Sequence, residues 1–354
     1  MTAIFYNYRH LLKICLRNTS KIKPNETRNN MKKRLLLGIV SLLMATSVSA
    51  NTPEGDFQDY IVNLKNEARE NGISEPILER AFKNVAFKEK AVKSDRNQPE
   101  KKLTLDEYIP RAVPKWKIKQ ANDLYQKHHE VLTRIGKEYG VQPRFIVALW
   151  GVESNFGKLT GGYNVIEALT TLAYDGRREA FFRKQTMAAL TILEQGHITP
   201  ENMKGSWAGA MGQCQFMPTS FLAYAVDGND DGRKDIWTTH ADVFASAANY
   251  LKQVGWDDTY TWGRQVTLPD AFDAEALKGL SEDKGKLLSE WGALGVRRLN
   301  GKSLPNVELE AWLVQPDDND GRAYLVYNNY QVLMDWNRSH YFALAVSHLA
   351  DSIK

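Results

Sequence analysis

The sequence predicts a mainly α-helical protein of the α+β class with a small β insertion. Apolar residues recur at helical spacing along most of the chain after residue 56, and Asn71-Gly72 and Gly140 mark ends of helices. Strand-like segments occur at 262–266, 308–314 and 322–327, and the turn-rich stretch between the last two predicts a hairpin. A length of 354 residues is sufficient for a sizeable core with two or three subdomains.

Residues 1–50 have the organisation of an export leader. Met31-Lys-Lys-Arg34 is basic, 35–44 is a nearly unbroken apolar run and 47–50 ends in small residues, which together predict a cleaved signal peptide. The apolar run is too short for a membrane anchor. Translation is expected to start at Met31, with residues 1–30 upstream of the true start, and the mature chain to begin near Asn51. No cysteine follows Ala50 directly, so we expect a periplasmic protein without a lipid anchor.

Charge and cysteine content exclude further classes of protein. The leader holds nine Lys and Arg residues and one Glu, which leaves 37 basic and 41 acidic residues in the mature chain. The basic pI therefore comes from the leader and does not indicate nucleic-acid binding. Cys214 is the one cysteine outside the leader, so no internal disulfide is expected. No accompanying pattern of His with Asn or Asp favours a catalytic thiol.

The mature chain divides into four predicted units. Residues 51–140 predict an N-terminal helical domain, in which the polar segment 88–102 follows the surface. Residues 141–256 form the predicted central core, with helical runs at 165–173, 178–195 and 241–254. The β insertion occupies 257–325, and 326–354 contains a C-terminal helix, at 330–349, that returns to the core.

Glu153 ends an apolar run with helical periodicity. Pro143 stands where a first-turn proline is tolerated, and the apolar positions of 145–152 predict a buried face. A carboxyl that aromatic neighbours desolvate has a raised pKa, so it holds a proton near neutral pH and suits protonation of a glycosidic oxygen. The alternative is a Glu near a helix end that an arginine or backbone amides satisfy.

A second unusual stretch, 206–221, combines small residues with aromatic and neutral polar side chains. Trp207 and Phe216 offer flat faces, and Ser206, Gln213 and Gln215 offer uncharged hydrogen-bonding groups. This combination suits a sugar ligand. In the alternative interpretation, the glycines allow close packing of helices and the glutamines face water.

Three motifs resemble the lytic murein transglycosylase B family of bacterial cell-wall enzymes. They are Gly-Val-Glu-Ser-Asn-Phe-Gly at 151–157, Gly-Ala-Met-Gly-Gln-Cys-Gln-Phe-Met-Pro at 209–218, and the Asp-rich loop before Trp237, and the likeness extends from about Phe57 to Ala350. The resemblance implies a lysozyme-like helical core that cleaves the β-1,4 bond between N-acetylmuramic acid and N-acetylglucosamine in peptidoglycan glycan strands.

The resemblance also implies the residues of the site. Glu153 would protonate the leaving oxygen and then, as a base, take the proton of the muramyl C6 hydroxyl, which closes a 1,6-anhydro ring. No second catalytic carboxylate is then required. Arg177 and Arg178 would meet a lactyl or stem-peptide carboxylate, for which a guanidinium is suited. The implied cleft residues are Ser206, Gln215, Phe216, Tyr250, Asn337 and Tyr341.

The Asp-rich loop has the spacing of a calcium-binding EF-hand loop. Oxygen-bearing side chains occupy positions 1, 3, 5 and 9, with Gly232 at position 6 and a backbone carbonyl at position 7. Position 12 departs from the pattern, because Thr238 replaces the bidentate Glu, and Asp242 is the proposed replacement. We expect a structural Ca²⁺ and no catalytic cofactor; the alternative is an Asp/Gly-rich turn. The expected ligands are Asp227, Asn229, Asp231, the Arg233 carbonyl, Asp235 and Asp242.

Two other functions remain open at this point. A muramidase would use water as the nucleophile and release reducing ends in place of anhydro ends. A calcium-dependent cell-wall-binding protein would recognise the same polymer without cleaving it. Partners in cell-wall synthesis or division are not identified by the sequence.

Overall fold

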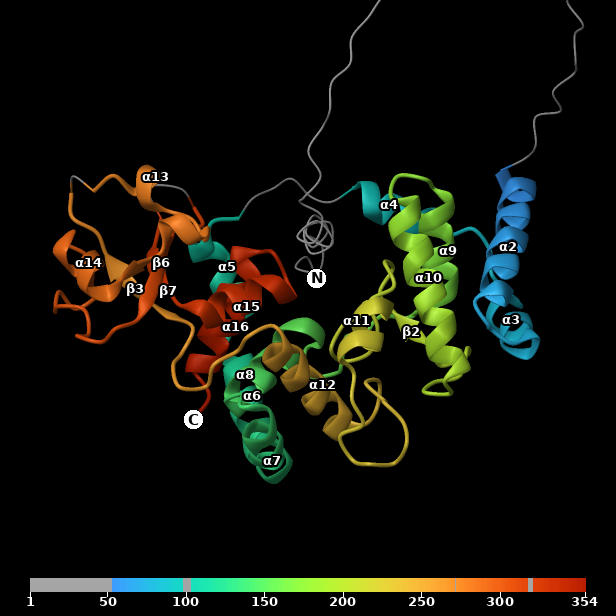
Figure 1. The fold of residues 1–354 in the computed structure, drawn as a ribbon, viewed down its shortest axis with the longest axis horizontal. Coiled ribbons are helices and arrows are strands. Elements are labelled where there is room, and N and C mark those ends of the chain that lie inside the picture. Colours follow the sequence, from blue (N-terminus) through green and yellow to red (C-terminus); the bar gives the residue numbers. More distant parts are fainter. Residues whose placement is uncertain (1–52, 98–102, 271, 318–320) are drawn as a thin grey trace, which may run out of the picture.

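The structure is a computed structural model that describes residues 53–97, 103–270, 272–317 and 321–354. The predicted leader, with its start at Met31 and its cleavage near Asn51, lies outside these residues. Figure 1 shows a helical lobe around α9 and α10 at one end, a central group of helices around α8, and a β lobe at the other end. Among the described helices, none is both long and apolar enough to cross a membrane. The predicted mainly helical fold with a small β part is confirmed.

The helical lobe is built on two helices that pack against each other, α9 and α10. Three N-terminal helices cover them, and the turn between the first two is at Gly72, whose φ of 84° suits the predicted break at Asn71-Gly72. Helix α4 lies within the polar segment that was predicted to follow the surface; its apolar contribution, Ala91 and Val92, is too short for a periodic signal. The lobe comprises α2 (Pro53–Glu70), α3 (Glu75–Phe82), α4 (Glu89–Arg96), α9 (Val165–Tyr174) and α10 (Glu179–Glu194).

The central group surrounds α8 (Pro143–Ser154), which contacts α6, α7, α12 and α16. The predicted long C-terminal helix is divided at Asn337 into α15 and α16. The polypeptide 51–140 contributes to both the helical lobe and this group, so its treatment as one domain stays a prediction. The other members are α5 (Leu105–Ala112), α6 (Lys115–Lys127), α7 (His129–Tyr139), α11 (Pro218–Tyr224), α12 (His240–Gln253), α15 (Asn328–Trp336) and α16 (His340–Asp351).

The β lobe is a five-stranded antiparallel sheet in the described chain, with strand order β4-β6-β7-β3-β5. The predicted hairpin is present, because β6 pairs with β7. The edge strands β4 and β5 were not predicted, since two residues are too few to show alternation. The elements are β3 (Gly263–Thr267), α13 (Ala274–Leu277), a 3₁₀ turn (Glu282–Lys284), β4 (Lys286–Leu287), α14 (Leu288–Ala293), β5 (Arg297–Arg298), β6 (Glu310–Val314) and β7 (Ala323–Val326).

The lobe has a separate small core under this sheet. Leu288, Trp291, Leu313 and Leu325 are among its buried residues. A further short ladder, β1 (Tyr163–Asn164) with β2 (Lys204–Gly205), is antiparallel and lies in the connections on either side of α9 and α10. This ladder brings the segment after residue 205 alongside the segment before α9.

Candidate active site

Helix α8 delivers Glu153 to an abrupt helix end. Its residues 145–151 are buried, so the helix is a fixed element of the core. Directly after it, Asn155, Phe156 and Gly157 have φ values of 50°, 58° and 79°. Left-handed conformations cost roughly 1–3 kcal/mol each for residues other than glycine, so the surrounding structure must enforce this turn. The last turn of α8 therefore presents Glu153 at a sharply defined position.

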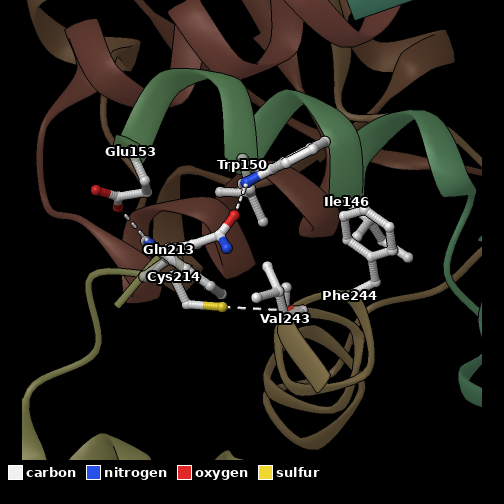
Figure 2. A pocket seen from close by; sticks show the side chains of 10 residues that line it. Ile146, Trp150, Glu153, Gln213, Cys214, Val243 and Phe244 are labelled. Carbon is white, nitrogen blue, oxygen red and sulfur yellow. Dashed lines mark hydrogen bonds between the residues drawn. The ribbon is translucent and has the colours of Figure 1, made fainter. Parts of the chain in front are cut away.

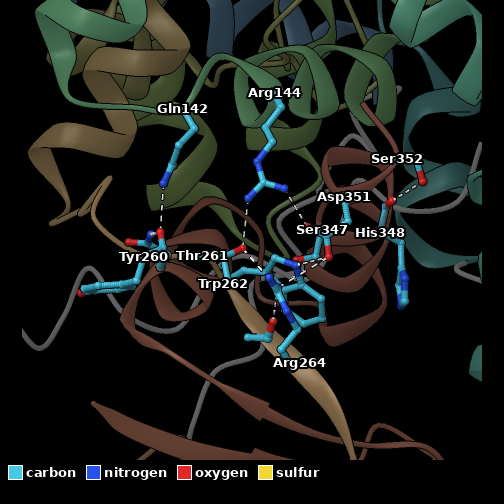
Figure 3. Close-up of polar contacts among 12 residues, drawn as sticks. Gln142, Arg144, Tyr260, Thr261, Trp262, Arg264, Ser347, His348, Asp351 and Ser352 are labelled. Carbon is cyan, nitrogen blue, oxygen red and sulfur yellow. Dashed lines mark hydrogen bonds and ion pairs between the residues drawn. The ribbon is translucent and has the colours of Figure 1, made fainter. Parts of the chain in front are cut away.

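The other end of α8 is anchored to the C-terminal helix and to the start of the β lobe (Figure 3). Arg144 donates to Asp351 at 2.8 Å and to Thr261 Oγ1 at 3.2 Å. Asp351 also accepts a 3.0 Å hydrogen bond from the indole of Trp262. Three segments distant in sequence thus fix the axis of α8, and with it the position of its acidic end.

The carboxyl of Glu153 is part-buried at the end of a small pocket (Figure 2). The indole Nε1 of Trp336 donates to Glu153 Oε1 at 2.7 Å. Burial raises the pKa of Glu153 to about 8, although the hydrogen bond from Trp336 acts in the opposite direction. The pocket is lined by Ile146, Leu149, Trp150, Glu153, Gln213, Cys214, Val243, Phe244, Ala247 and Trp336.

No neighbouring carboxylate contributes to the raised pKa of Glu153 within the described residues. Glu153 is also the one acid among the described residues that line its pocket. This part of the site therefore has one acid group that is protonated at neutral pH, which is the protonation state that a general acid requires.

An aromatic wall stands beside this acid. Trp336 lies edge to face with Tyr250, at 4.7 Å between ring centroids, and 5.3 Å from Phe216. Tyr224 extends the group through Tyr250, at 4.6 Å. The structure thus brings the predicted Phe216 and Tyr250 together with Glu153 through Trp336.

The segment 206–217 packs against the end of α8. Gln213 accepts a 2.7 Å hydrogen bond from the Trp150 indole (Figure 2). It also donates to the Trp237 carbonyl at 2.9 Å, so its amide is occupied by the fold. Gln215 has a φ of 50° and donates to the Gly212 carbonyl at 2.8 Å. Ser206 is buried and its hydroxyl accepts a 3.0 Å bond from the Ala210 amide. These contacts hold the loop in one conformation.

Tyr341 and Asn337 come from the α15–α16 region that also supplies Trp336. The Tyr341 hydroxyl donates to Asp317, and the Tyr341 ring lies edge to face with Tyr108 at 5.3 Å. Asn337 is buried at the end of α15, where its backbone amide donates to the Leu333 carbonyl at 3.0 Å. Their place in a substrate cleft stays a prediction.

Arg177 and Arg178 lie between α9 and α10 and share a buried acid, Asp95, from α4. Arg177 donates to Asp95 Oδ2 at 2.7 Å, and Arg178 forms an ion pair with Oδ1 at 3.5 Å. Asp95 is 3% exposed, whereas the arginine side chains remain 48% and 26% exposed. The structure thus adds a counter-ion that the sequence did not reveal. A role for the two arginines toward a substrate stays a prediction.

The Asp-rich loop has the oxygen donors and the glycine conformation of a cation site. Asp242, the proposed replacement for the ligand at position 12, accepts backbone hydrogen bonds from the loop. Gly232 has a φ of 89°, as position 6 requires, and Asp227 accepts backbone amides of the same loop, among them Gly232 at 2.7 Å. Asp242 is buried and accepts the amides of Gly228 at 2.8 Å and Asp235 at 2.6 Å. Among the described residues, no group of three or more His, Cys, Asp or Glu is arranged to hold a metal ion. The donor chemistry of the loop fits Ca²⁺; the carboxylates cap the loop backbone.

Cys214 is not a reactive thiol. It is buried, its Sγ donates to the Val243 carbonyl at 3.3 Å, and burial raises the pKa of the thiol far above its ordinary value. Because the thiolate is the nucleophilic form, a raised pKa makes this side chain inert. The prediction that Cys214 has no catalytic role agrees with this environment.

Two residues next to Glu153 were missed by the sequence analysis. Trp336 donates a hydrogen bond to the carboxyl. Burial raises the pKa of Tyr108 to about 12, and the negative charge of Glu153 adds to this shift. Tyr108 belongs to α5 and Trp336 to α15, far from residue 153 in sequence. A single sequence holds no signal that distinguishes these aromatics from ordinary core residues.

Comparisons with known proteins give the family. A family model described as the transglycosylase SLT domain matches residues 56–351. The chain is 32% identical over 231 residues to the membrane-bound lytic murein transglycosylase B of Escherichia coli, an alignment that covers 65% of this chain and 62% of that protein.

Solved structures agree with this relationship. SltB3 from Pseudomonas aeruginosa, in complex with NAG-anhNAM-pentapeptide, is 39% identical with a TM-score of 0.80, covering 84% of this chain and 79% of that one. The Escherichia coli lytic transglycosylase Slt35 in complex with calcium is 26% identical with a TM-score of 0.71, covering 84% and 92%. The expected lysozyme-like transglycosylase fold is confirmed. By its match over residues 56–351, the chain belongs to the transglycosylase SLT domain family.

Proposed function

We propose that this protein is a peptidoglycan lytic transglycosylase that cleaves the β-1,4 bond between N-acetylmuramic acid and N-acetylglucosamine. The observation that carries the proposal is Glu153, an acid at a rigid helix end. Burial raises its pKa to about 8, and no acidic neighbour among the described residues perturbs it. Family membership and the peptidoglycan fragment bound to SltB3 support the substrate class.

The reaction uses Glu153 twice. Its protonated carboxyl gives the proton to the glycosidic oxygen, the bond from muramyl C1 to that oxygen breaks, and N-acetylglucosamine leaves as the alcohol. The resulting carboxylate takes the proton of the muramyl C6 hydroxyl while O6 bonds to C1. The product carries a 1,6-anhydro ring, Glu153 is protonated again, and no water is consumed.

Asp317, which bonds the predicted cleft residue Tyr341, is poorly suited to hydrolysis, and this supports the proposed route. Hydrolytic glycosidases place a second carboxylate about 5–9.5 Å from the acid to act as nucleophile or to activate water. Asp317, near Tyr341, accepts hydrogen bonds from the Tyr341 hydroxyl and from the Leu105 amide, the latter at 2.7 Å. Both of its oxygens are engaged, so Asp317 is a poor candidate for water activation.

The proposed cleft uses the residues expected from the sequence. Phe216, Tyr250 and Tyr341 supply faces and a hydroxyl for sugar rings beside Glu153, and Ser206, Gln215 and Asn337 complete the polar lining. Arg177 and Arg178 recognise a lactyl or stem-peptide carboxylate, with Asp95 fixing their orientation.

The test is the mass of the muropeptides released from purified sacculi by the protein and by Glu153→Gln. The proposal requires products lighter by one water than those of hydrolysis, and no turnover by the variant. Reducing-end products would indicate a muramidase. Binding of sacculi without release of fragments by the unaltered protein would indicate a wall-binding protein.

We also propose that the 227–235 loop binds Ca²⁺ through the residues predicted from the sequence, with a structural role. The calcium in the Slt35 structure and the oxygen donors of the loop support it. Asp242 would connect the ion to α12. Thermal unfolding with Ca²⁺ and with EGTA tests the site: Ca²⁺ should raise the midpoint of the protein, and Asp231→Ala should reduce that rise. Equal midpoints with and without Ca²⁺ would exclude the site.

Export to the periplasm without a lipid anchor is the proposed location. The signal-peptide pattern of residues 31–50 supports it, and peptidoglycan lies in that compartment. The N-terminal sequence and intact mass of the protein recovered from a periplasmic extract test this: a chain beginning near Asn51 is expected, and retention of residues 31–50 would contradict it.

A further inference from the structure

The hydrogen bond between Trp336 and Glu153 has a directional consequence. Nε1 of Trp336 donates to Oε1 of Glu153 at 2.7 Å. An indole N–H can only donate, so the oxygen that receives it is an acceptor whether the carboxyl is charged or neutral. In the neutral acid the carbonyl oxygen is the better acceptor, so this hydrogen bond favours the form in which the proton resides on the other oxygen. Within the described residues, Oε2 receives no hydrogen bond.

We infer that Trp336 is a positioning residue that confines the exchangeable proton of Glu153 to Oε2, so that one oxygen both delivers and recovers the proton. The inference rests on the function proposed above. It assigns distinct tasks to the two oxygens: Oε1 is held by the protein, and Oε2 faces the reacting groups. The carboxyl need not rotate between the two halves of the reaction.

The surroundings of Trp336 hold its indole in this orientation. The ring lies 4.7 Å from Tyr250 in an edge-to-face arrangement and 5.3 Å from Phe216. Trp336 is the last residue of α15, and Glu153 is in the last turn of α8, so both groups come from the ends of helices packed in the core. Preorganisation of this kind means that little reorientation is required when the proton moves.

The electrostatic effect has a definite sign. A hydrogen-bond donor stabilises the carboxylate more than the neutral acid, so the indole lowers the pKa of Glu153 against the larger effect of burial. Loss of the N–H is expected to raise that pKa. Activity that depends on the protonated acid would then persist to higher pH, although each turnover would be slower because the carboxyl is less well oriented.

Trp336→Phe tests the inference, because it keeps an aromatic ring and removes the N–H. The alkaline limb of kcat/KM should move upward by roughly one to two pH units, the range expected for a hydrogen bond to a charged group, and kcat should fall about tenfold. Trp262→Phe is the matched control, since that indole also donates to a carboxylate, Asp351, at 3.0 Å (Figure 3). Its alkaline limb should coincide with that of the unaltered protein. An unshifted limb in Trp336→Phe would overturn the inference.

A second measurement does not depend on the folding of that variant. The indole ¹H–¹⁵N resonance of Trp336 in the unaltered protein should titrate with the alkaline limb of activity, and Glu153→Gln should abolish the titration. A resonance that stays constant across the limb would contradict the inference. Retained turnover by Glu153→Gln would instead refute the proposed function, which separates the two failures.

Discussion

Replacement of Glu153 by glutamine should make the protein more stable while it removes the activity. The pKa of Glu153 is about 8 in the folded protein against an ordinary value of 4.5. Between these pH values the unfolded chain has lost a proton that the folded protein keeps. The free energy of unfolding therefore falls as pH rises from about 4.5 to about 8, and it stays at the lower level above that range. The Glu153→Gln variant would lack this dependence, because a glutamine side chain does not titrate.

The size of the effect follows from the difference in pKa. At about 1.4 kcal/mol per pH unit, a change from 4.5 to about 8 corresponds to an upper value of about 5 kcal/mol. Because Glu153 is part-buried by surface area, screening by solvent reduces the expected gain to about 2–4 kcal/mol. The gain should be present at about pH 8.5 and nearly absent at about pH 4.

Urea unfolding of the protein and of Glu153→Gln at these two pH values measures the difference. Effects of all other titrating groups are shared and cancel in the comparison. Glu138→Gln, on the exposed surface of α7, is the control and should change the free energy of unfolding by less than about 0.5 kcal/mol at either pH. A Glu153→Gln variant that is no more stable at high pH than at low pH would refute the burial argument.

Three further predictions concern activity and packing. The value of kcat/KM should fall about tenfold per pH unit above about pH 8, because Glu153 loses its proton there. A pH profile of kcat/KM that is flat to about pH 10 would exclude Glu153 as the general acid. Gly157→Ala should reduce the free energy of unfolding by roughly 2–4 kcal/mol, because φ is 79° and the added carbon would lie 2.3 Å from another side chain. Gly72→Ala, at φ 84° in open space, should reduce it by only about 1 kcal/mol. Thermal unfolding measures both, and equal losses would contradict the packing argument. Asp95→Ala should reduce the free energy of unfolding in urea by about 1–3 kcal/mol, because two arginines lose their buried partner. The control Asp123→Ala, at an exposed ion pair, should reduce it by less than about 0.5 kcal/mol. A loss for Asp95→Ala no larger than that of the control would show that the ion pairs of Asp95 do not stabilise the fold.

The sequence predicted the elements whose signals are local. The periodicity of 145–152 predicted α8, Asn71-Gly72 predicted the end of α2, and the turn-rich stretch after residue 314 predicted the β6–β7 hairpin. Glu153 was identified because its surroundings along the chain are apolar. The pocket at Glu153 is lined mainly by apolar residues, so such residues also surround it in three dimensions.

The remaining features depend on contacts between distant segments, which a single sequence does not report. Trp336 meets Glu153 across 183 positions, and Asp95 meets Arg177 across 82. The break between α15 and α16 at Asn337 was also missed, although residues 337–340 are four polar residues in succession. Gln213 was expected among the uncharged groups that suit a sugar. Its side chain instead bonds the Trp150 indole and a backbone carbonyl, which only the folded structure reveals.

The most direct test of the one-acid mechanism is cleavage of sacculi in water enriched in ¹⁸O. If the C6 hydroxyl of the substrate is the nucleophile, the muramyl ends released by the protein will contain no ¹⁸O. Incorporation of one ¹⁸O atom at muramyl C1 would show that water attacks this carbon, and Glu153 would then need a partner that activates water.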